Sequence, residues 1–172
     1  MSILIVVESM FGNTRSVAEA VAAGVAGQAT GHHEKVEVVA VADAPRRIPD
    51  DVTVLLVGGP THALSMSRAG TRADAVRQGA TAPAATGLRE WIAEVGPRED
   101  LPTVTFDTRV HVRLVPGSAA KSAAAALRHR GFRKATRGET FYVGDVAGPL
   151  DEGELERARA WGESLVGQLA GR

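Results

Sequence analysis

Residues 3–15 of the chain read ILIVVESMFGNTR, and this stretch decides the fold. Its first five residues are apolar and mostly β-branched, which is typical of a strand covered on both faces in the centre of a parallel sheet. The residues that follow change to helical spacing, with apolar side chains at Val17, Ala18, Val21, Ala22 and Val25. The pattern therefore predicts a central strand, a turn within residues 8–15, and a helix.

That turn is rich in hydroxyl, amide and glycine residues: Ser9, Gly12, Asn13 and Thr14. The first N–H groups of a helix have no partner inside the helix, and the helix dipole adds partial positive charge there, so a phosphate group would be held well. The turn has neither the Gly-Lys-Ser/Thr of a Walker motif nor the glycines of the dinucleotide fingerprint, so purine nucleotides and NAD lose their usual sequence support. The alternative is a capped helix start that binds nothing.

Strand and helix patterns alternate five times along the chain. After the first pair, we expect strands at 35–41, 52–57, 103–106 and 133–143, and helices at 71–78, 88–95, 119–130 and 155–169. Such alternation predicts a parallel sheet with right-handed crossovers and helices on both faces. The half-polar strand 35–41 is expected at an edge, the apolar strand 52–57 near the centre, and Gly58-Gly59-Pro60 is expected to end that central strand.

Two motifs resemble those of the flavodoxin family. Ser-x-x-Gly-Asn-Thr at residues 9–14 resembles the loop that receives the phosphate of FMN, and residues 55–62, LLVGGPTH, resemble the third strand and flavin loop of that family and of its quinone-reductase relatives. The resemblance implies a three-layer α/β/α fold, with a doubly wound, five-stranded parallel sheet in the order 2-1-3-4-5. We expect it to form a single domain over residues 1–172.

The resemblance also implies that FMN binds where three loops meet at the carboxyl ends of the strands. The first loop would hold the phosphate, the main chain of the second would face N5 and the pyrimidine edge of the ring, and residues 107–109 occupy the place of the third loop. For His62 the alternative is an exposed turn residue, and for residues 107–109 it is a capped strand end. The implied cofactor-binding residues are Ser9, Met10, Phe11, Gly12, Asn13, Thr14, Pro60, Thr61, His62, Ala63, Asp107, Thr108 and Arg109.

The sequence departs from electron-carrier flavodoxins in two ways. Lys+Arg and Asp+Glu are both 20, whereas those carriers are strongly acidic, and neither the second nor the third loop has a Trp or Tyr to stack on the ring. Trp91 and Trp161 fall on the apolar stripes of predicted helices, so we expect them in the core. These departures predict looser FMN binding or a ring face left open for a substrate.

Two classes of function follow from these observations. The first is an FMN protein that passes electrons to a redox partner protein, or that reduces a quinone-type acceptor with NAD(P)H. The second is a flavodoxin-fold binding or regulatory module that has lost its flavin.

The stretch from Arg109 to Arg137 contains Lys and Arg residues and no acidic residue, which is typical of a solvated face. The alternative is a dock for an acidic partner or for the phosphates of a nicotinamide nucleotide.

Composition excludes several other classes. The chain has no Cys, which excludes disulfides, thiolate metal sites and a cysteine nucleophile. We expect no metal site at His32-His33, no nucleic acid partner because the charges balance, and no membrane span because no apolar run is long enough. Met1-Ser2 leads straight into the first strand without room for a signal peptide, so we expect a cytoplasmic protein.

Overall fold

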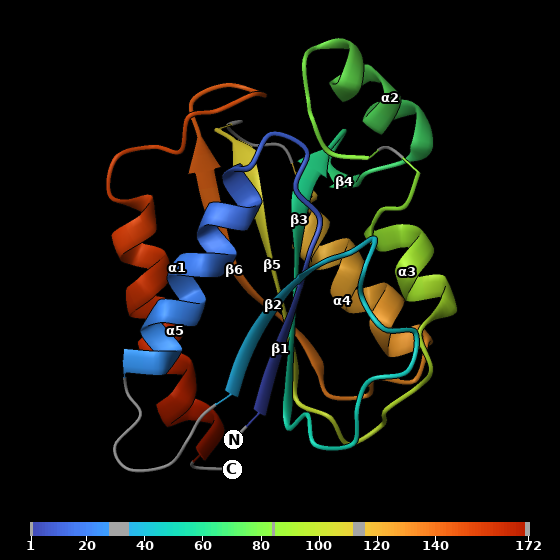
Figure 1. Cartoon of the computed structure of the whole chain (residues 1–172), viewed down its shortest axis with the longest axis vertical. Helices are drawn as coiled ribbons and strands as arrows, with labels where there is room; N and C mark the ends of the chain where they lie inside the picture. Colours follow the sequence, from blue (N-terminus) through green and yellow to red (C-terminus); the bar gives the residue numbers. More distant parts are fainter. Residues whose placement is uncertain (1, 28–34, 84, 112–115, 171–172) are drawn as a thin grey trace.

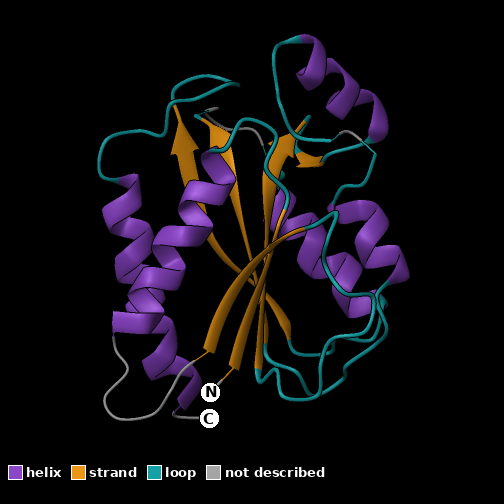
Figure 2. Cartoon of the chain, in the orientation of Figure 1, coloured by secondary structure: helices purple, strands orange, loops and turns teal. Residues whose placement is uncertain are grey.

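The computed structural model describes residues 2–27, 35–83, 85–111 and 116–170. A twisted sheet lies between two layers of helices, with α1 and α5 on one face and α3 and α4 on the other (Figures 1 and 2). The strands are β1 (Ser2–Val7), β2 (Lys35–Ala40), β3 (Val54–His62), β4 (Ser65–Met66), β5 (Thr103–Val110) and β6 (Ala135–Val143). The helices are α1 (Asn13–Gly27), α2 (Ala69–Arg77), α3 (Leu88–Glu94), α4 (Ala119–His129) and α5 (Glu154–Ala170).

Five of the strands pair in parallel in the order β2-β1-β3-β5-β6, which confirms the predicted order 2-1-3-4-5. β1 alternates its buried side chains between the two faces: Ile3 and Ile5 pack with the core of α1 and α5, and Leu4 and Val6 with that of α3 and α4. Both faces of this strand are therefore covered, which explains its unbroken apolar sequence. β2 lies at the edge, as its half-polar sequence predicts.

The sheet has a sixth strand that the sequence did not predict. β4 pairs antiparallel with the end of β3, with Thr61 opposite Met66 and His62 opposite Ser65. Ala63 and Leu64 form the turn between them with φ angles of 45° and 66°. Two consecutive positive φ values are the geometry of a tight hairpin turn, but such turns usually carry Asn or Gly, so Ala-Leu gave no signal for one.

The prediction that Gly58-Gly59-Pro60 ends the third strand is wrong, because β3 continues through Pro60 to His62. Glu8 N donates to Gly58 O at 2.9 Å, so the main chain of Gly58, and of Pro60 two residues later, is directed toward β1. β1 has already ended at Val7. The missing N–H of Pro60 therefore costs no ladder hydrogen bond, and β3 remains paired with β5 on its other side.

Helices α1 and α5 approach so closely that glycine is required at their contact. A Cβ atom on Gly24 would lie 2.0 Å from Arg159 O, and one on Gly162 would lie 2.2 Å from Val21 O. This contact packs α1 closely against α5 on the same face of the sheet. Trp91 is fully buried, as predicted for a core residue, whereas Trp161 is only partly buried and packs against Phe106.

Helix α2 lies above the carboxyl ends of the strands and outside the two helical layers (Figure 1). Its bounds, Ala69–Arg77, agree with the helix predicted at 71–78. None of the helices in the described part of the chain is both long and apolar enough to cross a membrane.

Candidate functional site

The three predicted loops meet at one cavity of about 250 Å³ at the carboxyl ends of β1, β3 and β5. Ten of the thirteen predicted site residues line it, together with residues from α2 and from the β6 side of the sheet. Ser9, Gly12 and Asp107 are not among its lining residues. The lining consists of Met10, Phe11, Asn13, Thr14, Pro60, Thr61, His62, Ala63, Thr71, Asp74, Ala75, Gln78, Thr108, Arg109, Val110, Val143 and Val146.

The amino end of α1 presents backbone donors beside this cavity. Ser9 Oγ accepts a hydrogen bond from Arg15 N at 3.2 Å and so caps the helix. Within the described ranges, no acceptor is bonded to the backbone N–H groups of Gly12, Asn13 and Thr14. Gly12 has a φ of 92°, which turns the chain into the helix and favours glycine. The helix start therefore leaves its donors available to an anion.

Asn13 and Thr14 connect this helix start to neighbouring segments. Asn13 Nδ2 donates to Ala147 O at 3.1 Å, so the Asn13 side chain holds the loop after β6 and does not cap α1. The hydroxyl oxygens of Thr14 and Thr108 are 2.7 Å apart, and both residues are buried. The first loop is thereby fixed to the end of β5.

Asp107 supports the site from behind the cavity wall. Its side chain is fully buried; Oδ1 accepts from Thr140 Oγ1 at 2.6 Å, and Oδ2 accepts from Thr61 Oγ1 at 2.8 Å and from Ala120 N at 3.1 Å. Thr61 Oγ1 in turn accepts from Ala119 N at 2.8 Å. Asp107 and Thr61 therefore cap α4 and fix the second loop to the third, and the charge of Asp107 suits the positive end of the helix.

His62, the last residue of β3, lies half-buried at the cavity. Burial and the positive charge of Arg72 both lower the pKa of His62 below its ordinary value of 6.5. The imidazole is therefore neutral at pH 7, and one of its ring nitrogens offers an N–H donor without a full charge.

Solved structures of flavodoxins resemble this chain over nearly its whole length. A flavodoxin from the domain Archaea aligns over 99% of both chains with a TM-score of 0.64 and 17% sequence identity. Flavodoxin 1 from Bacillus cereus aligns over 97% of this chain and 98% of its own, with a TM-score of 0.63 and 14% identity. The chain has the flavodoxin fold.

The WrbA-like flavodoxin of Agrobacterium tumefaciens is a third structure with this fold, at a TM-score of 0.51 and 16% identity over 99% of this chain and 98% of its own. No protein-family model and no curated protein matches the sequence. This flavodoxin-fold chain thus shares its fold with these structures, but little of its sequence.

Helix α2 supplies a wall of the cavity that sequence reasoning missed. Thr71, Asp74, Ala75 and Gln78 line the cavity and recur at helical spacing of three or four residues. That spacing was readable in the sequence. It does not by itself indicate what the helix face contacts, because the position of α2 depends on contacts with distant segments.

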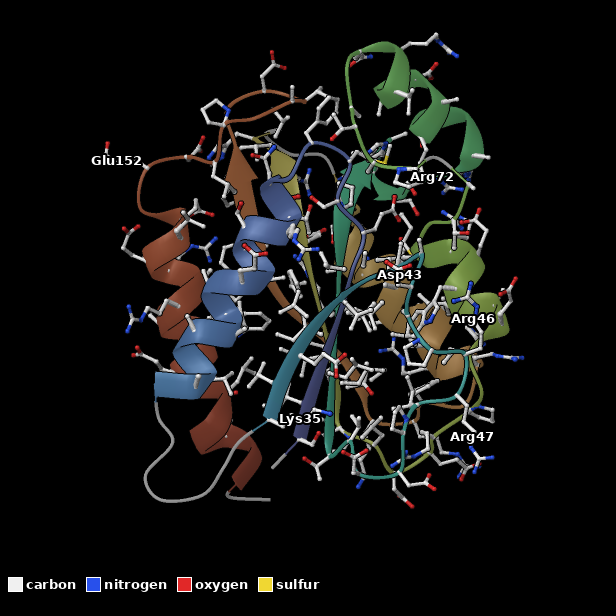
Figure 3. All side chains as sticks on the ribbon, viewed as in Figure 1. Lys35, Asp43, Arg46, Arg47, Arg72 and Glu152 are labelled. Atoms are coloured by element: carbon white, nitrogen blue, oxygen red, sulfur yellow. The ribbon has the colours of Figure 1, made fainter. Side chains whose placement is uncertain are left out.

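A buried polar cluster connects α2 to the rest of the flavodoxin fold, and its central residue is Arg72 of α2, labelled in Figure 3. Arg72 is fully buried; its Nη1 donates to Ser67 Oγ at 2.9 Å, and its Nη2 lies 3.1 Å from Glu90 Oε1. Glu8, which follows β1, is also buried, and its Oε2 accepts from Leu88 N at 2.7 Å. Burial raises the pKa of the Glu8 carboxyl above its ordinary value of 4.5, although the nearby Arg72 acts in the opposite direction.

Several of the basic residues between 109 and 137 form local contacts. Arg128 Nη1 and Arg130 Nε donate to the main-chain oxygens of Ala135 and Val95 at 2.9 and 2.7 Å. Other basic residues of this run form ion pairs, Arg133 with Glu99 and Lys134 with Asp100. These contacts fit a solvated face better than a dock for phosphates. Arg113 and the His32-His33 pair, where we expect no metal site, lie outside the described residues.

Proposed function

We propose that this protein binds FMN in the cavity and uses it to transfer electrons. The observation that carries the proposal is the amino end of α1, where the N–H groups of Gly12, Asn13 and Thr14 have no acceptor within the described residues. A phosphate monoester fits there, because several donors and the positive end of a fifteen-residue helix converge on it. The likeness of residues 9–14 to a flavodoxin phosphate loop supports the same ligand.

The remainder of the cavity suits a flat ring with one polar edge. Apolar side chains of Met10, Val110 and Val143 line it beside the main chain of the second loop. His62 would offer a neutral N–H donor to the ring, and Arg109, whose Nη1 donates to Gly117 O at 2.8 Å, is fixed at the wall. Bound FMN would supply the redox chemistry by accepting electrons from one reactant and giving them to another.

We propose further that the electron acceptor is a small, flat, quinone-type molecule and that NAD(P)H is the electron source. Phe11 and His62 are the residues with an aromatic or imidazole ring among the described residues that line the cavity. No Trp or Tyr of this lining therefore covers a bound flavin ring. A ring face left uncovered can be approached by a flat substrate. A one-electron carrier that serves a partner protein is the second candidate, favoured by the lack of a second nucleotide-binding motif in the sequence.

Titration of the purified protein with FMN tests the binding proposal. We expect saturable quenching of flavin fluorescence and a shifted visible absorption spectrum. Loss of NADH or NADPH absorbance on adding a quinone to the FMN-loaded protein would support the reductase over the carrier. If flavin fluorescence is unchanged at high micromolar FMN, the proposal fails and a flavin-free binding module becomes the better description.

A further inference from the structure

The polar face of α2 carries hydrogen-bonding groups that no other part of the described protein uses. The Thr71 hydroxyl is occupied, because it accepts from Arg68 N at 2.9 Å and donates to Arg68 O at 3.0 Å. Asp74 Oδ1 pairs with Arg77, which leaves Asp74 Oδ2 without a partner among the described residues. The Gln78 side-chain amide has no hydrogen-bond partner in the same set. Asp74 and Gln78 both line the cavity.

These two side chains lie one helical turn apart, so they reach the same region of the cavity. Asp74 Oδ2 can only accept a hydrogen bond, whereas the Gln78 amide can donate two and accept others. An acceptor beside a donor is complementary to a cyclic imide, in which an N–H group lies between two carbonyl groups. The pyrimidine edge of a flavin is such an imide.

We propose that Asp74 and Gln78 recognise the pyrimidine edge of the bound flavin. Asp74 Oδ2 accepts the hydrogen bond of the ring N3–H, and the Gln78 amide donates to an adjacent ring carbonyl. This assignment rests on the proposed binding of FMN, and it adds two side chains from outside the three loops to the ring site.

The anchoring of α2 supports this role, since a recognition pair must be held in place. The buried Arg72 connects α2 to Ser67 after β4 and to Glu90 of α3. Ala75, on the cavity face, packs with Met10 of the first loop in a small apolar cluster. A Cβ atom on Gly87 would lie 2.4 Å from Arg72 Nη1, so the guanidinium fits closely against the start of α3. Asp74 in α2 and Gln78 directly after it are thus presented by a helix that is fixed on two sides.

The test compares the affinities of FMN and N3-methyl-FMN, which lacks the N3–H donor. We expect the wild-type protein to bind N3-methyl-FMN about tenfold more weakly than FMN, the size expected for one hydrogen bond to a charged group. In Asp74→Ala/Gln78→Ala we expect weaker FMN binding and a preference for FMN that falls below about threefold. Val76→Ala is the matched control, because Val76 is exposed on the same helix and is not a lining residue.

Asp74→Asn provides a second variant, which preserves the shape of the side chain. Because residue 74 is exposed, folding should be unaffected. This variant should also reduce the preference for FMN, because a neutral amide oxygen accepts the hydrogen bond of N3–H less strongly than a carboxylate does. If both variants bind FMN and keep the wild-type preference, the inference about α2 is overturned while FMN binding stands. If the wild-type protein binds neither flavin, the proposed function fails and this inference fails with it.

Discussion

The side-chain oxygens of Thr14 and Thr108 lie 2.7 Å apart in a buried position, and they connect the first turn of α1 to the end of β5. Thr14 belongs to the first loop of the candidate site and Thr108 to the third. One hydroxyl pair therefore sets the spacing between two loops that are ninety-four residues apart in sequence.

Replacing one member of this pair should destabilise the protein. Thr108→Val keeps the shape of the side chain but leaves the Thr14 hydroxyl buried without its partner, so the free energy of unfolding should fall by about 1–2 kcal/mol. In Thr14→Val/Thr108→Val neither hydroxyl remains, so the loss should be smaller than the sum of the two single losses. Urea unfolding of the wild type, Thr14→Val, Thr108→Val and the double variant measures this coupling. Strictly additive losses in the free energy of unfolding would contradict it.

Substitution of Gly24 should weaken the contact between α1 and α5. A Cβ atom there would lie 2.0 Å from Arg159 O, which is main chain and cannot rotate away. We expect Gly24→Ala to cost about 1–3 kcal/mol, even though Ala favours the helix. Gly27→Ala is the matched control near the end of the same helix, because a Cβ atom there meets nothing within 4 Å. Thermal unfolding should separate the two variants, and equal melting temperatures would argue against a close helix contact.

Much of the fold was predictable from the continuity of apolar residues. β1 is apolar throughout because helices cover both of its faces, and β2 alternates because it lies at the edge. The extension of β3 through Pro60 was not predictable, since it depends on β1 ending at Val7 and leaving no ladder bond for proline to lose.

The meeting of the three loops at one cavity was predictable from their positions in the sequence, but the directions of their side chains were not. Asp107 and Thr108 follow each other at the end of β5, and consecutive strand residues point to opposite faces. Asp107 therefore bonds to the start of α4, while Thr108 faces Thr14 and the cavity. The place of Asp74 beside the cavity could not be inferred either, because it depends on the contacts of Arg72 with distant residues.

Glu8 should make stability depend on pH. Because its pKa is raised in the folded protein, Glu8 contributes stability below its ordinary pKa of 4.5 that is lost as the pH rises through the folded-state value. Glu8→Gln removes this titration, so the stability of the variant relative to wild type should increase with pH above 4.5 and then level off. The groups that face Glu8, Arg72 and Glu90, are the same in both proteins. Urea unfolding over this pH range provides the measurement; parallel curves would mean that Glu8 is not desolvated.

A negative charge at residue 13 should act on the phosphate of FMN and not on its ring. Asn13→Asp places a carboxylate at the start of α1, where the proposed phosphate lies, so repulsion should weaken FMN binding by about tenfold or more and riboflavin binding far less. Asn13→Ala is the control, because it removes the hydrogen bond to Ala147 O without adding charge. Fluorescence titrations with both flavins should show a loss specific to FMN that shrinks as salt is added, since salt screens the repulsion. Equal losses for FMN and riboflavin in Asn13→Asp would place the phosphate elsewhere in the cavity.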